Sequence, residues 1–156
     1  YLDIDKRASR FFRDTEGVRA IIEANRIGGD EERHVAFEHV DYRHTLDLPD
    51  GAFALPVSLC AGLISDHCTR PLRVGGRLLA NPSHGDVAMA SLDDRYRLAG
   101  VVQRRADGAY EVDDRELHRF LVPKKPQQPT AEDIRALGRR IAYHRSPFAY
   151  PFARVT

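Results

Sequence analysis

Four polar side chains of this chain lie within one hexapeptide, NPSHGD at residues 81–86: Asn81, Ser83, His84 and Asp86. Imidazole side chains titrate near neutral pH, so His84 is the best candidate in the chain for a general base acting on a hydroxyl or an amine. The amide, hydroxyl and carboxylate beside it could line the pocket of the group that loses the proton. A hydrogen-bonded turn, in which Asn81 and Asp86 accept backbone amides, explains the same residues without chemistry.

Two acids follow short apolar segments elsewhere in the chain. Asp3 lies in YLDID with Ile4 after it, and Asp41 lies in HVAFEHVDY with Tyr42 after it. In an open α/β sheet, ligands bind beyond the carboxyl ends of the strands. Both acids are therefore candidates for a ligand site, and the alternative is an exposed strand-end acid for Asp3 and a turn acid for Asp41.

The two cysteines do not suggest a disulfide framework or a metal centre. Cys68 follows His67, but the paired short spacings of a zinc site are missing around it and around Cys60. The sequence therefore predicts free thiols and no metal site.

The surrounding residues predict strands that alternate with helices. Apolar alternation or continuous apolar runs predict strands over 1–5, 34–42, 52–64, 77–81, 96–105, 116–123 and 146–155. Helical spacing and capping residues predict helices over 6–12, 16–26, 66–72, 87–93 and 131–140, with Ser65 and Thr130 as N-caps of the third and fifth. Gly75 and Gly76 are expected to stop the third helix, and Pro56 cannot donate a ladder hydrogen bond in its strand.

This order predicts an α/β layered fold with a mainly parallel sheet. The length of 156 residues predicts one domain, and 42% hydrophobic with 30% charged residues predicts a globular, soluble chain. No apolar run reaches the roughly 18 residues of a membrane helix, and the first ten residues do not resemble a signal peptide. We therefore expect a cytoplasmic protein without a membrane partner. Because Tyr1 falls inside an apparent strand, we also expect residues before it.

The order of these segments resembles the class I S-adenosylmethionine-dependent methyltransferases, from their second strand onward. The resemblance rests on YLDIDKRA as the acid-ended second strand, FEHVDY as the third, LPDGAFALPVSLCAGLI as the turn and fourth strand, and LRVGGRLLAN as the helix, glycine turn and fifth strand. It implies a three-layer Rossmann-like α/β core at 1–123, incomplete at its N-terminus. A basic, aromatic C-terminal extension, 124–156, would pack on the same domain.

The resemblance also implies S-adenosylmethionine as the cofactor. Asp3 would accept hydrogen bonds from both ribose hydroxyls, and Ile4 would pack against the adenine face. Asp41, with Tyr42 beside it, would accept from the adenine amino group. Ser58, in the loop after the fourth strand, is assigned to the same cofactor site.

For the second substrate, the resemblance places NPSHGD over the cofactor edge, with His84 as the catalytic base and Asn81, Ser83 and Asp86 in the acceptor pocket. The Asn-Pro-Pro-Tyr or Asp-Pro-Pro-Tyr motif that grips a target nitrogen is missing, so a small molecule or a protein is favoured over a base amine as acceptor. The first strand and glycine-rich loop, which in the family hold the methionine end, are not found in these residues.

Two other functions fit parts of the sequence. Segment 124–156 has seven basic residues against Glu132 and Asp133, hence a net charge of +5. Its aromatic residues Tyr143, Phe148, Tyr150 and Phe152 interleave with arginines, as in proteins that stack bases and neutralise phosphates, which would suit a non-catalytic, nucleic-acid-binding module. Such aromatics also dock on a domain's own core. A nicotinamide-dependent oxidoreductase would share the sheet and the ribose acid, but no Tyr-x-x-x-Lys pattern is present. The acceptor and the oligomeric state are not predicted.

Overall fold

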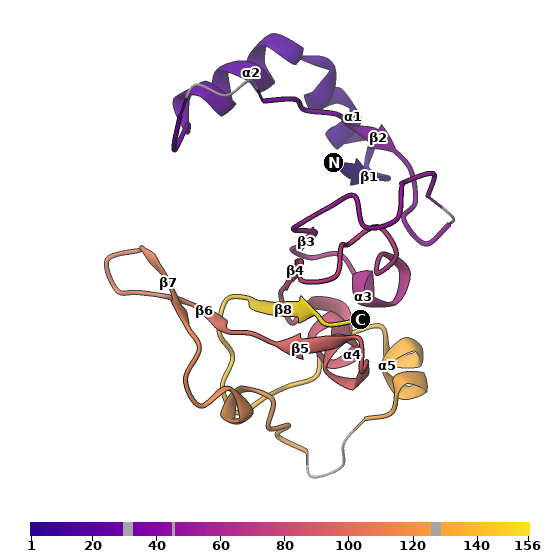
Figure 1. Ribbon diagram of the computed structural model, residues 1–156, viewed down its shortest axis with the longest axis vertical. Coiled ribbons are helices and arrows are strands. Elements are labelled where there is room, and N and C mark those ends of the chain that lie inside the picture. Colours follow the sequence, from indigo (N-terminus) through magenta and orange to yellow (C-terminus); the bar gives the residue numbers. More distant parts are fainter. Residues whose placement is uncertain (30–32, 45, 126–128) are drawn as a thin grey trace. The chain divides into compact units, whose positions relative to one another are not determined.

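The computed structural model describes residues 1–29, 33–44, 46–125 and 129–156, and the chain divides into two compact units, Tyr1–Leu46 and Asp47–Thr156 (Figure 1). Both units combine helices with short strands, so the α/β class is as predicted. Among the described residues, no helix combines the length and the apolarity needed to cross a bilayer.

The smaller unit holds a two-stranded parallel sheet and two helices. Its elements are β1 (Leu2–Asp3), α1 (Lys6–Arg13), α2 (Thr15–Ala24) and β2 (Glu38–His39). Aspartates start both helices, because the Asp5 carboxylate accepts from the Arg7 amide and the Asp14 carboxylate from the Gly17 amide. Both helices are as predicted, whereas the second strand is much shorter than the expected 34–42.

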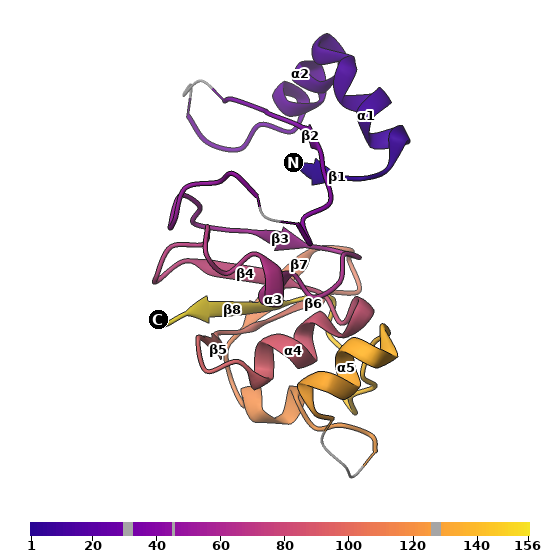
Figure 2. The same cartoon turned by 90° about the vertical axis from the view of Figure 1, so that its right-hand side faces the viewer.

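The larger unit is built on a four-stranded sheet in the order β3-β4-β8-β5 (Figure 2). These strands are β3 (Val57–Ser58), β4 (Arg77–Ala80), β5 (Tyr96–Leu98) and β8 (Tyr150–Arg154). β3 and β4 are parallel, but β8 lies between β4 and β5 and runs antiparallel to both. The sheet is therefore mixed, which corrects the expectation of a mainly parallel one. β8 pairs antiparallel with both of its neighbours, and antiparallel strands do not need the crossover helix that joins parallel ones.

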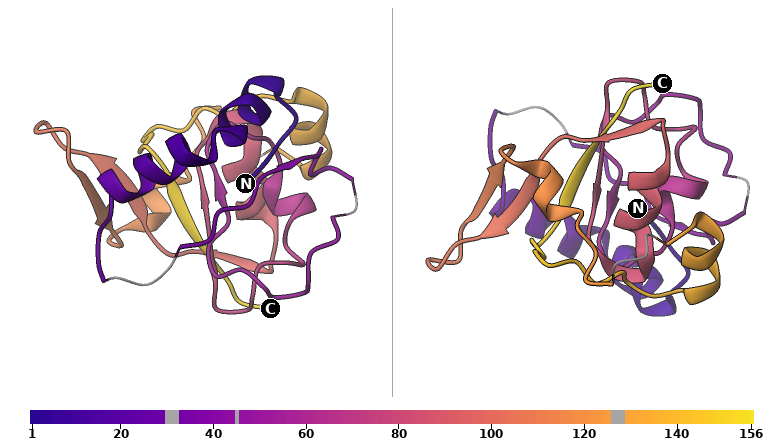
Figure 3. Two further views of the ribbon diagram at one scale, coloured as in Figure 1. Left: turned by 90° about the horizontal axis from the view of Figure 1, so that it is seen from above. Right: turned by 90° about the horizontal axis from the view of Figure 1, so that it is seen from below.

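Helices cover one side of this sheet. They are α3 (Ile64–His67), α4 (Asp86–Leu92), which follows the short 3-10 turn η1 (Ser83–Gly85), and α5 (Ala131–Leu137). Figure 3 shows them on one side of the strands and the hairpin of β6 (Val101–Arg104) and β7 (Tyr110–Asp113) extending from the other. The core between helices and sheet contains the fully buried Leu78, Val87, Ile134, Tyr150 and Phe152.

Several local expectations are wrong. The predicted strand 116–123 is the 3-10 helix η2 (Leu117–Phe120), and the strand that pairs with β6 is β7. The run 52–64 forms a strand only at Val57–Ser58, directly after Pro56. Ser65 lies inside α3 rather than capping it, because Leu63 occupies the N-cap position in a left-handed conformation and the Ser65 hydroxyl donates elsewhere. Thr130, by contrast, caps α5 as predicted and forms a capping box with Asp133.

The glycine pair makes the turn into β4 instead of ending a helix, since α3 ends at His67. The Gly75 amide donates to the Arg154 carbonyl at 2.8 Å, and the Arg154 amide donates to the Gly76 carbonyl at 2.9 Å. Gly75 has a φ of +79° with open space beside it, whereas a Cβ on Gly76 would lie 2.8 Å from the Arg73 carbonyl oxygen and 2.9 Å from that of Ala54. The two positions need glycine for different reasons.

We expect Gly76→Ala to lower the free energy of unfolding by about 2–3 kcal/mol, because backbone atoms must shift to admit the methyl group. Gly75→Ala is the matched control: it meets no atom and carries only the left-handed backbone cost of about 1 kcal/mol. Urea unfolding of both variants measures the difference. Equal losses would show that the close approach at Gly76 is relieved without cost.

Candidate functional site

Two loops follow the parallel strands of the larger unit and meet at one edge of its sheet. Residues 59–63 follow β3, and residues 81–85 follow β4. The carboxyl ends of adjacent parallel strands are where α/β sheets bind ligands. We call the polar residues Cys60, Asn81, Ser83 and His84 of these loops the two-loop site.

Hydrogen bonds join the two loops. The Asn81 side-chain oxygen accepts from the backbone amides of Cys60 and Ser83, both at 3.2 Å. The Asn81 amide nitrogen also lies 3.6 Å from the Cys60 sulfur, and the Ser83 hydroxyl lies 2.6 Å from Nδ1 of His84. With Nδ1 engaged by Ser83, Nε2 is the nitrogen of His84 that is left to exchange a proton.

Left-handed backbone conformations concentrate here. Of the four described non-glycine residues with positive φ, three lie in these loops: Cys60 at +70°, Leu63 at +58° and His84 at +55°. Such conformations cost free energy and cluster at functional sites. The loops also touch closely, because a Cβ on Gly62 would lie 2.8 Å from Cβ of His84. The arrangement holds an exposed thiol and an exposed imidazole at fixed places on one surface.

A buried carboxylate, that of Asp86, forms hydrogen bonds with residues on either side of loop 59–63 and directly follows loop 81–85. Asp86, the first residue of α4, is fully buried and accepts from the Ser58 hydroxyl at 2.6 Å. Its other oxygen accepts from the backbone amide of Ser65 at 3.2 Å and from the Ser65 hydroxyl at 3.1 Å. Burial raises the pKa of Asp86, and these hydrogen bonds oppose the rise. Asp86 thus ties the end of β3 and the start of α3 to α4.

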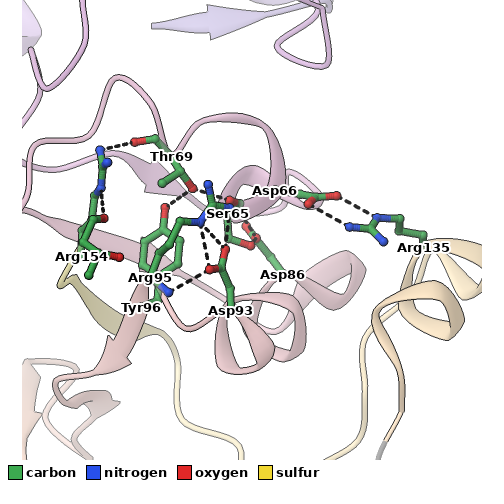
Figure 4. Close-up of polar contacts among 10 residues, drawn as sticks. Ser65, Asp66, Thr69, Asp86, Asp93, Arg95, Tyr96, Arg135 and Arg154 are labelled. Atoms are coloured by element: carbon green, nitrogen blue, oxygen red, sulfur yellow. Dashed lines mark hydrogen bonds and ion pairs between the residues drawn. The ribbon is translucent and has the colours of Figure 1, made fainter.

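The polar network continues away from Asp86 (Figure 4). The Thr69 hydroxyl donates to the Ser65 carbonyl at 2.6 Å and lies 2.8 Å from the Tyr96 hydroxyl. Because Thr69 has one proton to give, Tyr96 is the donor in the second bond. Burial raises the pKa of Tyr96. Further out, Asp66 of α3 faces Arg135 of α5 in a two-bond ion pair at 2.9 and 3.0 Å.

The two candidate acids of the smaller unit, Asp3 and Asp41, lie at or just after the ends of parallel strands. Asp3 ends β1, and Asp41 lies two residues beyond His39, the residue that Asp3 faces in β2. The exposed Asp3 carboxylate accepts from the Asp5 amide at 2.8 Å, and Ile4 beside it is 59% exposed. The hydrogen-bonded Arg43 guanidinium holds the pKa of Asp41 well below its usual range. Tyr42, next to Asp41, is half-buried.

The structure therefore brings the predicted residues together in two groups. In the smaller unit, Asp3 and Ile4 lie at the end of β1, and Asp41 and Tyr42 follow the neighbouring β2. In the larger unit, Asn81, Ser83 and His84 share hydrogen bonds around one turn, whereas Ser58 and Asp86 lie in the interior and bond to each other. The turn interpretation of NPSHGD is partly realised, since Asn81 and Asp86 both accept backbone amides.

Sequence reasoning missed Cys60 and Ser65. Cys60 sits in a loop that the sequence assigned to the end of a strand, and its position beside Asn81 depends on pairing between β3 and β4. Cys68 differs from it, because burial raises the pKa of the Cys68 thiol to about 11. Within the described ranges, no three His, Cys, Asp or Glu side chains converge as a metal site would require.

The aromatic residues of the C-terminal segment are mostly in the core. Tyr143, Tyr150 and Phe152 are buried, and only Phe148, at 44% exposure, reaches the surface. The phenol pKa of Tyr143 rises to about 12 through burial. Three of the four rings are therefore not available for base stacking.

Comparisons with known proteins leave the family open. No protein-family model matches the chain, and neither a curated protein nor a solved structure matches it.

Proposed function

We propose that this chain serves S-adenosylmethionine-dependent methyl transfer to a small molecule or a protein. The observation that carries the proposal is the placement of Asp3 and Asp41 after two hydrogen-bonded parallel strands, where α/β sheets bind nucleotides. The resemblance of the sequence to class I methyltransferases supplies the identity of the ligand. The three-layer Rossmann-like arrangement is part of the same proposal, and a reversed strand such as β8 is compatible with it, since many doubly wound sheets carry one.

Residues at and just after the ends of the two parallel strands of the smaller unit fit the adenosine half of this cofactor. One oxygen of the Asp3 carboxylate accepts a hydrogen bond from the Asp5 amide. The carboxylate can still accept hydrogen bonds from two hydroxyl groups. Ile4 presents an exposed apolar side chain beside it, as a purine face requires. Asp41 is held ionised by Arg43, which donates to both carboxylate oxygens, so an adenine amino group would share these acceptors with Arg43.

Taken by itself, the two-loop site of the larger unit offers what an acceptor would need, a candidate general base with polar neighbours. When bound, S-adenosylmethionine supplies an electrophilic methyl group, so the chain needs mainly to position the acceptor and to remove its proton. In the proposal Nδ1 of His84 carries the ring proton and donates to the Ser83 hydroxyl oxygen, which leaves Nε2 unprotonated and able to take the proton of the acceptor. Asn81 holds the two loops together, and Ser58 and Asp86 support them from the interior instead of touching the acceptor.

Calorimetric titration of the chain with S-adenosylmethionine, S-adenosylhomocysteine and adenosine tests the proposal. We expect all three to bind saturably and with similar affinity, because the residues assigned to the cofactor hold its adenosine half. The affinity should change little with salt, unlike nucleic-acid binding, which weakens steeply. Absence of binding of all three at about 1 mM ligand would overturn the proposal.

A further inference from the structure

A polar cavity lies in the larger unit, apart from the two-loop site. It has a volume of about 490 Å³, is open to solvent on one side, and is lined by the β6–β7 hairpin, the residues that lead into η2 and the segment 145–147. Its lining includes Asp113, Arg115, Glu116, Phe120, Arg145 and Ser146. None of these residues takes part in the proposed methyl transfer.

The charged side chains that line this cavity are two acids, Asp113 and Glu116, and two arginines, Arg115 and Arg145. Asp113 is paired with Arg115 at 2.9 Å, and Glu116 is paired with Arg119 at 2.7 Å. Within the described part of the chain, Arg145 is the charged residue of this lining that forms no ion pair. An anionic ligand would neutralise it.

Arg145 is also held in place. Its guanidinium carbon lies 5.5 Å from the centre of the Phe120 ring, within the range of a cation–π contact, and Phe120 is 5% exposed. At the other end of the residue, the hydroxyl of the buried Tyr150 donates to the Arg145 carbonyl at 3.4 Å. A guanidinium fixed over an aromatic ring loses less conformational freedom on binding a ligand than a mobile one does.

The wall next to Arg145 contains an unusual backbone conformation. Glu116 has a φ of +50°, which makes it the fourth described non-glycine residue with a left-handed backbone, and the only one of them outside the loops 59–63 and 81–85. This conformation places Glu116 at the start of η2, where it pairs with Arg119. Glu116 therefore has an ion-pair partner other than Arg145, and Ser146 adds a neutral hydrogen-bonding side chain to the lining.

We infer that this cavity binds a small anionic ligand, through two oxygens of a carboxylate or a phosphate group that Arg145 holds. Both groups match the forked donors of a guanidinium, and the cavity is large enough for a small metabolite. The inference is independent of the proposed methyl transfer, because the two sets of residues do not overlap.

Arg145→Gln tests the inference. Inorganic phosphate and acetate are titrated separately into the isotope-labelled chain, with chloride keeping the ionic strength constant, and the amide resonances of Ser146 and Arg145 are followed. We expect saturable shifts in the wild type, and an affinity lowered about tenfold or more in the variant. Response to phosphate alone would identify a phosphate ligand, and response to acetate alone would identify a carboxylate.

Arg140→Gln is the control, since Arg140 is an exposed arginine of the same segment that does not line the cavity. It should leave the titration unchanged. Arg145→Lys separates charge from geometry, because lysine keeps the charge without the fork and should bind more weakly than arginine. Shifts that never saturate, or that persist in Arg145→Gln with unchanged affinity, would overturn the inference whether or not S-adenosylmethionine binds.

Discussion

Asp86→Ala is expected to lower the free energy of unfolding by about 2–4 kcal/mol. The substitution leaves the Ser58 hydroxyl, the Ser65 hydroxyl and the Ser65 amide without the carboxylate that accepts all three in a fully buried place. Each buried donor left unpaired costs about 1–3 kcal/mol, and removal of the desolvated carboxylate offsets part of the sum. Urea unfolding at neutral pH measures the loss.

Two further variants test whether the loss comes from the hydrogen bonds of Asp86 and not from removal of any carboxylate. Asp94→Ala removes an exposed carboxylate of the same unit and should change stability by less than about 0.5 kcal/mol. Asp86→Asn keeps an oxygen to accept from Ser65 and an amide that the Ser58 oxygen can accept, so it should cost less than alanine. If alanine and asparagine both lie within about 0.5 kcal/mol of the wild type, Asp86 does not hold the two loops.

Asp86 and Asp66 should make the free energy of unfolding depend on pH in opposite directions. Burial raises the pKa of Asp86 above that of the unfolded chain, so the folded state binds the proton more tightly. Stability contributed by this group is therefore full below the ordinary aspartate range and decreases as pH rises through the raised pKa. Asp66 has the opposite sign, because its hydrogen bonds with Arg135 lower its pKa. Asp86→Asn should remove the decrease at rising pH and leave the loss at acid pH.

How far the sequence predicts this fold depends on whether the signal is local. The helices α1, α2 and α5 were predictable because their N-caps are Asp5, Asp14 and Thr130, residues whose side chains reach amides within three positions. Asp107 and Gly108 are typical turn residues and indicate the hairpin β6–β7. The apolar residues of 116–123, however, have the pattern of a strand, and they predict one where none forms. There the left-handed Glu116 and a 3-10 turn bury Phe120 instead.

The candidate site was predictable only in part, because its bonds connect distant residues. NPSHGD could be identified from its composition, and Asn81, Ser83 and His84 do share one turn. The pairing of Ser58 with Asp86 spans 28 positions and depends on the packing of α4 against the sheet, which no short pattern encodes. For the same reason, Cys60 gains its place beside Asn81 only when β3 and β4 pair.

Asp3→Ala is expected to weaken binding of S-adenosylmethionine and adenosine about 10- to 100-fold. A carboxylate that accepts two ribose hydroxyls contributes hydrogen bonds of about 1.5–3 kcal/mol, and each 1.4 kcal/mol is tenfold in affinity. Calorimetric titration measures the loss, with Asp94→Ala as the control that should bind normally. Asp3→Asn keeps an oxygen for the Asp5 amide, so any loss in it reports on the ligand instead of the turn before α1.

The ribose assignment is tested most directly with 2′-deoxyadenosine. If Asp3 accepts the 2′-hydroxyl, the wild type should bind deoxyadenosine more weakly than adenosine, while Asp3→Ala should bind both alike, since the carboxylate that distinguishes them is gone. Such coupling between a side chain and a ligand group isolates their interaction from effects on folding. Equal discrimination by wild type and variant would move the ribose away from Asp3 even if the cofactor binds. Because Asp41 already bonds to Arg43, Asp3 is the carboxylate of the pair with the fewer internal donors, so this cycle examines the residue on which the adenosine site depends most.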